Sequence, residues 1–154
     1  MFETVVVATD GSESVKRAVD VGLDLANRFD ATVHALSIID AGEVDASPEQ
    51  LREELETALE THADAALATV EERASLDLTT AIREGRPARE VCSYAREIDA
   101  DLVVTGTRGR HGENRLLLGS VAERVVRTSP VPVLTVRQLD PSDGGSTGED
   151  AVSA

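Results

Sequence analysis

Short runs of β-branched residues alternate along the chain with longer segments whose apolar residues recur every three or four positions. The runs predict five strands, at residues 5–8, 31–39, 76–83, 102–104 and 131–136. The first and fourth are apolar throughout, which is typical of strands buried on both faces of a parallel sheet. The third alternates only in part, because Thr80 shares the face of Leu78 and Ile82, and this predicts a strand near an edge.

A segment with apolar residues at helical spacing follows each of the first four predicted strands. The first helix is expected from Ser12, with that residue as its cap, and Ser47 is expected to cap the second, with Pro48 at its first position. The third helix follows Pro87. Ser120 and Glu123 have the spacing of a capping box and predict a fourth helix that begins at Ser120.

This order of elements predicts an α/β fold. Strands that alternate with helices form right-handed crossovers, so we expect a doubly wound parallel five-stranded sheet with helices on both faces. Such sheets bind ligands at the carboxyl ends of strands, where the strand order changes direction. Residues 138–154 contain four acidic and no basic residues and predict a disordered acidic tail after a domain at 1–137.

The net charge of −14 narrows the choice of partners. Such a surface repels phosphate backbones and anionic lipid headgroups, so we expect neither nucleic-acid nor membrane binding. Lys16 is the only lysine beside fourteen arginines, and aromatic residues make up 2%. This composition indicates a halophile protein, although an ordinary acidic protein remains an alternative.

The N-terminus lacks the basic start and apolar stretch of a signal peptide, and no apolar run reaches membrane-spanning length. We therefore expect a cytoplasmic protein. A single cysteine, Cys92, excludes an internal disulfide and is expected to lie in the core. His34, His62 and His111 do not have the spacing of metal ligands, and the first two are expected to be structural.

The segment with candidate chemistry is a glycine-spaced loop between a buried strand and a helix. It contains Gly106, Gly109 and Gly119, and Ser120 opens the helix behind it. Glycine lets the backbone approach an anion closely, and the first amides of a helix have no acceptor of their own. The loop therefore predicts a phosphate site.

Positive charge is concentrated in the same loop. Within eight residues the loop contains Arg108, Arg110, His111 and Arg115. Glu113 is the one acidic residue in the same segment. A cationic cluster on an acidic protein favours an anionic ligand. The alternative is that each arginine pairs with an acidic side chain elsewhere on the surface.

The spacing Gly106-x2-Gly109-x9-Gly119-Ser120 resembles the nucleotide-binding pattern of the ATP-binding branch of the universal stress protein family. Segments 5–12, 85–88, 101–106 and 130–136 are similar to further blocks of that family in the same order, so the resemblance covers residues 3–137. It implies a Rossmann-like sheet of the adenine nucleotide alpha hydrolase type, with strand order 3-2-1-4-5.

The resemblance also implies roles for single residues. Asp10 would accept hydrogen bonds from the ribose hydroxyls, Thr9 would lie beside the adenine, and Ile38 would pack on it. The phosphates, with Mg²⁺ or Mn²⁺, would be held by Gly106, Arg108, Gly109, Gly119, Ser120 and Val121. Alternatives remain open: Asp10 as a turn residue, Ile38 as plain core and Ser120 as a helix cap. Ala8 replaces a proline that many relatives have there.

The family resemblance implies a regulatory protein of the stress response that binds an adenine nucleotide, ATP, and forms a homodimer through its last strand. One alternative is a slow ATPase or phosphoryl-transfer enzyme, but the loop offers no clear base. Another is a dimeric stress protein that does not bind nucleotide. The chain has no Walker motif, no Gly-x-Gly-x-x-Gly after its first strand and no Gly-x-Ser-x-Gly elbow.

Overall fold

The structure, a computed structural model, describes residues 2–108 and 118–139. Its centre is a sheet of five strands: β1 (Thr4–Ala8), β2 (Thr32–Asp40), β3 (Leu78–Gly85), β4 (Leu102–Gly106) and β5 (Val133–Val136). All neighbours are parallel and the order is β3-β2-β1-β4-β5, so the predicted architecture is confirmed. The third strand is an edge strand, as its partial alternation predicted.

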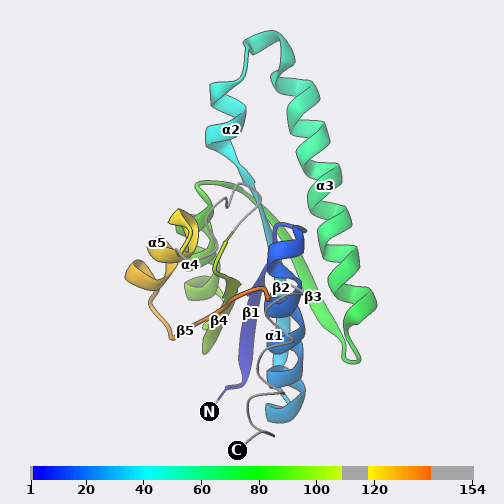
Figure 1. Cartoon of the computed structure of the whole chain (residues 1–154), viewed down its shortest axis with the longest axis vertical. Coiled ribbons are helices and arrows are strands. Elements are labelled where there is room, and N and C mark those ends of the chain that lie inside the picture. Colours follow the sequence, from blue (N-terminus) through cyan, green and yellow to red (C-terminus); the bar gives the residue numbers. More distant parts are fainter. Residues whose placement is uncertain (1, 109–117, 140–154) are drawn as a thin grey trace, which may run out of the picture.

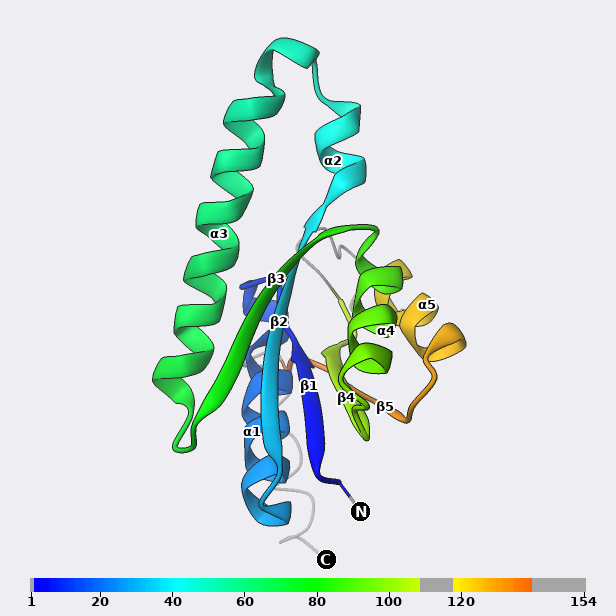
Figure 2. The same ribbon diagram turned by 180° about the vertical axis from the view of Figure 1, so that it is seen from behind.

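Helices cover both faces of the sheet (Figures 1 and 2). Helices α1 (Lys16–Phe29) and α3 (Arg52–Arg73) share one apolar cluster with Val5 and Val7 of β1. Helices α4 (Pro87–Glu97) and α5 (Ser120–Thr128) share another with Val6 of the same strand. Successive residues of a strand point to opposite faces, so a short apolar run such as β1 supplies both cores at once.

Helix α1 lies close to the middle of the sheet because Gly22 has no side chain. A Cβ at this position would lie 2.9 Å from Val7 Cγ2 and 3.4 Å from Val104 Cγ1. The helix therefore crosses the boundary between β1 and β4 with its backbone almost against the sheet. This contact holds together the two strands that frame the candidate site.

The sheet divides at its carboxyl edge. Strand β1 pairs with β4 only as far as Val7 opposite Val104. Pairing of β1 with β2 continues to Ala8, and pairing of β4 with β5 continues to Gly106. The chains after β1 and β4 thus leave the sheet in different directions, which opens the switch point where doubly wound folds bind ligands.

An arm formed by α2 (Ala41–Ala46) and the first half of α3 extends beyond the carboxyl ends of the strands (Figures 1 and 2). Helix α2 was not predicted. Asp40 starts it by accepting a hydrogen bond from the Gly42 amide at 2.9 Å. The prediction that Ser47 caps the next helix is wrong: its hydroxyl donates backwards to the Glu43 and Val44 carbonyls, at 2.8 and 2.9 Å.

Two further capping predictions are confirmed only in part. Ser12 is the N-cap residue of the first helical segment, which begins as a 3₁₀ turn, Glu13–Val15, but its side chain makes no cap because its hydroxyl donates to Asp10. Helix α5 begins at Ser120, as predicted, but its capping position belongs to Gly119 and not to Ser120.

Several other expectations concern single segments. Cys92 is buried, as predicted, with its Sγ 3.6 Å from Thr128 Oγ1. Within the described residues, no helix combines the length and the apolar character needed to span a lipid bilayer. Residues 109–117 of the glycine loop and 140–154 of the predicted tail lie outside the described residues.

Candidate functional site

The turn after β1 carries Asp10 at the carboxyl edge of the sheet. Its Oδ1 accepts two hydrogen bonds, from the Ser12 amide at 2.9 Å and from the Ser12 hydroxyl at 2.6 Å. Both donors hold the same oxygen, and among the described residues no donor is recorded for Oδ2. The carboxylate therefore has a set orientation and one oxygen available to a ligand.

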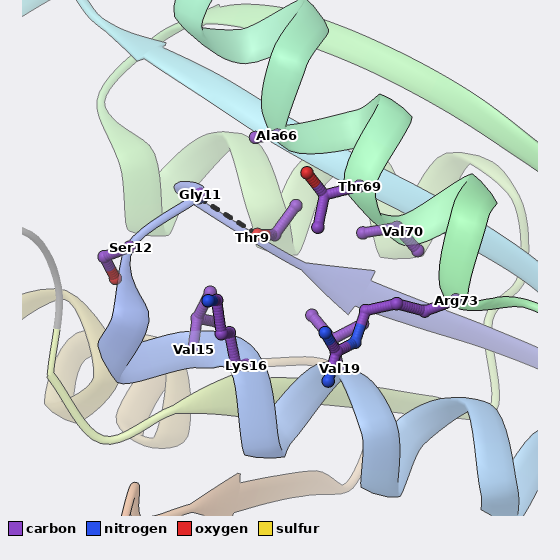
Figure 3. A pocket seen from close by; sticks show the side chains of 10 residues that line it. All are labelled: Thr9, Gly11, Ser12, Val15, Lys16, Val19, Ala66, Thr69, Val70 and Arg73. Atoms are coloured by element: carbon purple, nitrogen blue, oxygen red, sulfur yellow. Dashed lines mark hydrogen bonds between the residues drawn. The ribbon is translucent and has the colours of Figure 1, made fainter.

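Thr9 precedes that carboxylate and ties the turn to the sheet. Its amide donates to the Leu36 carbonyl at 2.9 Å, and its Oγ1 accepts from the Gly11 amide at 3.1 Å. The side chain is 7% exposed. It lines a small crevice between α1 and α3 (Figure 3) rather than the wall that Asp10 lines.

The end of β4 lies against the same turn. A Cβ at Gly106 would come within 3.2 Å of the Ser14 carbonyl oxygen and 3.5 Å of the Arg108 carbonyl oxygen. No side chain fits there without a shift of backbone. The absence of a side chain at 106 thus allows the β1 turn and the start of the glycine loop to lie together.

Helix α5 points its N-terminus toward this edge. The Gly119 amide donates to the Thr107 carbonyl at 2.6 Å, so this amide has a partner within the protein. Its N-cap residue, Gly119, has no side chain with which to cap the helix. The amides of Ser120 and Val121 are in its first turn, where a helix offers no acceptor, and both residues are exposed. These amides and the helix dipole form a site for negative charge.

Arg108 brings a cation to the beginning of the loop. Its Nε is buried and has no hydrogen-bond partner among the residues that the structure describes. A buried guanidinium nitrogen without a partner is costly, and an anion is the partner that would satisfy it. Gly109, Arg110, His111 and Arg115 lie outside the described residues.

Asp10 and Ile38 line one small cavity of about 10 Å³ at the end of β2. Ser37 and His62 line it as well. The enclosed space is roughly enough for one water molecule. Any larger ligand in contact with these residues would therefore occupy the open edge beside the cavity.

The crevice in Figure 3 is a second cavity, of about 20 Å³, between α1 and α3. Its two cations already have partners. Lys16 pairs with Glu13 at 2.7 Å, and Arg73 donates two hydrogen bonds to Asp20, at 2.7 and 2.6 Å. The hydrogen bonds from Arg73 lower the pKa of Asp20, and the same pairing raises the pKa of Arg73. This crevice is about as large as one water and does not fit a nucleotide.

A cluster of titratable groups lies away from the carboxyl edge, between β2, β3 and α4. His34 Nδ1 is 2.8 Å from the Tyr94 hydroxyl, and the Arg83 guanidinium carbon lies 5.1 Å from the Tyr94 ring centroid. Burial lowers the pKa of His34 and raises the pKa of Tyr94. A hydrogen bond from Arg83 lowers the pKa of Glu97. These groups satisfy one another and join α4 to the sheet edge.

Among residues 2–108 and 118–139, no group of three or more His, Cys, Asp or Glu side chains is arranged to hold a metal ion. Within these ranges Asp10 brings one carboxylate to this edge, and its Oδ1 already accepts two hydrogen bonds from Ser12. A cation here would need the oxygens of a bound anion, which is how Mg²⁺ is held beside substrate phosphates.

The predicted residues thus lie in two groups at the carboxyl edge of the sheet. Asp10 and Ile38 lie at the ends of β1 and β2, while Gly106, Arg108, Gly119, Ser120 and Val121 lie between β4 and α5. The sequence interpretation missed Ser14, whose carbonyl lies against Gly106, and treated His62 as structural only. No local pattern indicates either contact, because both depend on how distant segments pack.

Comparison with known proteins agrees with this geometry. The sequence pattern of the universal stress protein family matches residues 1–137. Universal stress protein MJ0531 of Methanocaldococcus jannaschii is 35% identical over 147 residues, which cover 90% of this chain and 84% of that protein. Universal stress protein YxiE of Bacillus subtilis is 30% identical, covering 89% of this chain and all of that one.

Solved structures give the same result. The structure of protein MJ0577 superimposes with a TM-score of 0.76 at 26% identity, covering 91% of this chain and 99% of that chain. A universal stress protein solved in complex with cAMP has a TM-score of 0.65 at 28% identity, covering 90% and 98%. Since both sequence and fold agree over almost the whole chain, this protein belongs to the universal stress protein family.

Proposed function

We propose that this chain is a nucleotide-dependent regulatory protein of the stress response that binds ATP where β1 and β4 separate. The observation that carries the proposal is the buried Arg108 Nε, which has no hydrogen-bond partner among the described residues. The residue before it, Thr107, accepts a hydrogen bond from the Gly119 amide, so the N-terminus of α5 lies close to this part of the loop. Both features favour an anion of the size and charge of a phosphate group. The complex of a relative with cAMP supports an adenine nucleotide as the ligand.

The residues at the edge fit the parts of the nucleotide. Oδ2 of Asp10 would accept from the ribose hydroxyls, and Ile38 would pack on the adenine. Thr9 lines the crevice between α1 and α3, so it would hold the turn before Asp10 rather than contact the base. The phosphates would lie against Arg108 and the amides of α5, with the backbone of Gly106, Gly109 and Gly119 beside them. Mg²⁺ or Mn²⁺, bound through the phosphate oxygens, would supply neutralising charge.

Regulation would follow from differential binding. A ligand shifts a conformational or assembly equilibrium only as far as it binds one state better than the other. Because the nucleotide would contact both β1 and the glycine loop, it would favour the conformation in which these two walls approach. We propose that the protein acts in the cytoplasm as a homodimer formed through β5, and that the homodimer responds to this change of conformation.

Isothermal titration with ATP and Mg²⁺ tests the binding proposal. Arg108→Gln should weaken ATP binding by about tenfold or more, the loss expected for one charge-assisted hydrogen bond. Arg124→Gln is the matched control, because Arg124 is an exposed residue further along α5 and loses the same charge. Gly119→Val should also weaken binding: its backbone, at φ −63°, accepts a side chain, which would then cover the phosphate site.

Equal affinities in the Arg108 and Arg124 variants would contradict the phosphate assignment. The same samples, assayed for phosphate release, separate a regulatory protein from an enzyme. We expect stoichiometric binding without turnover. Release of many phosphates per minute would instead indicate an ATPase.

A further inference from the structure

His62 connects the long helix α3 to the turn that carries Asp10. Its Nε2 lies 2.8 Å from the backbone carbonyl oxygen of Asp10, 52 residues away in the sequence. A carbonyl oxygen only accepts, so the imidazole Nε2–H donates this hydrogen bond. The side chain is exposed, so the bond adds nothing to the apolar core and acts on the turn itself.

The turn leaves little room between itself and α3. Gly11 has a left-handed backbone, with φ at 75°, and a Cβ there would lie 2.9 Å from Ala66 Cβ and 3.4 Å from His62 Nε2. Helix α3 therefore rests directly on the backbone of this turn. Any displacement of α3 at His62 would move the residue next to the Asp10 carboxylate.

Ser37 of β2 lies at the same place and is 3% exposed. It lines the small cavity that Asp10, Ile38 and His62 also line. Residues of the turn after β1, of β2 and of α3 therefore meet around the carboxylate of Asp10.

We propose that His62 is a positioning residue for ribose recognition, which holds the Asp10 turn so that the free oxygen of the carboxylate faces the nucleotide's hydroxyls. This inference rests on the proposed nucleotide binding and assigns its sugar specificity to a contact between α3 and β1. Ser12 holds Oδ1 from one side of the turn, and His62 holds the backbone from the other. The arm helix α3 thereby becomes part of the ligand site without touching the phosphates.

Two substitutions separate positioning from mere packing. His62→Leu removes the N–H donor, whereas His62→Gln keeps an N–H group at a similar reach. Each variant is titrated with ATP and with 2′,3′-dideoxy-ATP, which lacks both hydroxyls that Asp10 could bind. We expect the wild type to prefer ATP, the Leu variant to lose about tenfold in ATP affinity and most of this preference, and the Gln variant to stay within about threefold of the wild type.

A double-mutant cycle with Asp10→Asn gives the sharpest control. If His62 acts through the Asp10 carboxylate, His62→Leu should have little further effect on ATP affinity in the Asp10→Asn background. Equal loss of affinity for ATP and for the dideoxy nucleotide would overturn the inference, since it would show general loosening of the site. Unchanged preference in the Leu variant would overturn it as well.

The controls distinguish this inference from the proposed function. A wild-type protein that binds neither nucleotide refutes the nucleotide site and, with it, this assignment. A wild type that binds and prefers ATP, with a Leu variant that does the same, refutes only the role of His62. Should His62→Leu unfold, His62→Asn, which is shorter and polar, replaces it in the same titrations with the same expectation.

Discussion

His34 shows how a single half-buried side chain makes stability depend on pH. Burial lowers its pKa in the folded protein, while the unfolded chain keeps the ordinary value of about 6.5. Between these two values the unfolded chain binds the extra proton and the folded protein does not. The free energy of unfolding is therefore fully maintained above about pH 6.5 and falls as pH decreases toward the lower, folded value.

Urea unfolding at pH 7.5 and at pH 5.5 measures this effect. The wild type should lose more stability between these values than His34→Gln, which does not titrate and can still hydrogen-bond to the Tyr94 hydroxyl. The neighbouring Glu97 and Tyr94 do not interfere, because the pKa of Glu97 is lowered and that of Tyr94 is raised, both away from this range. Equal losses in the two proteins would show that burial of His34 does not matter.

Two serine side chains differ from the sequence interpretation, because each hydroxyl bonds to a group other than the helix amide that it was expected to cap. Ser12 and Ser47 occur where helix caps are common, yet their hydroxyls bond to Asp10 and to the end of α2. Both outcomes are local and use the same chemistry as capping. Only the three-dimensional position of the competing acceptor separates them.

Among the elements, the edge strand β5 is the one through which we propose that the dimer forms. It is four residues long and pairs with β4 on one side. The Val103 amide donates to the Pro132 carbonyl at 3.0 Å. The backbone groups of Pro132, and of every second residue after it, therefore face β4. By this alternation the backbone groups of Val133 and Thr135 face away from the sheet, where a second copy could pair with them.

Thr135→Pro tests the proposed dimer at this edge. Proline removes an amide that faces outward and leaves the ladder with β4 intact, while Thr135→Val retains that amide as the control. Analytical ultracentrifugation should give twice the mass of one chain for the wild type and the Val variant, and the mass of one chain for the Pro variant. A Pro variant that is folded and still dimeric would place the interface elsewhere.

For the whole molecule, the net charge of −14 should make stability depend on salt. At 0.1 M ionic strength charges interact over about 10 Å, and at 1 M over about 3 Å. Salt therefore screens the repulsion between acidic groups. The exposed ion pairs, such as Arg28 with Asp24 at 2.9 Å, are weakened too, but each contributes at most about 1 kcal/mol. Repulsion should dominate the balance.

We expect the midpoint of thermal unfolding to rise by several degrees between 0.1 and 2 M KCl, as in a protein adapted to high salt. Near pH 4.5, where the chain is close to neutral, the same salt step should have a much smaller effect. Differential scanning calorimetry at both pH values measures this. A midpoint that is flat or falls with KCl at neutral pH would contradict the halophile interpretation.

Much of the architecture was predictable because it follows from periodicity. Alternate residues of β1 face opposite cores, and α1 presents one apolar side, so the runs around Val5 and Val19 specify a covered parallel sheet before any contact is known. The carboxyl edge as the place of the site follows from the same pattern, since Asp10 and Gly106 each end a buried strand. Such features depend on neighbours a few residues apart.

Contacts between distant segments could be known only from the folded chain. The hydrogen bond between His62 and Asp10, the approach of Ser14 to Gly106 and the division of the sheet after Val7 each depend on where whole elements lie. The position of an element is set by the packing of all its side chains together. Local periodicity predicts which face of a helix is buried. The position and tilt of that helix against the sheet decide which atoms come into contact.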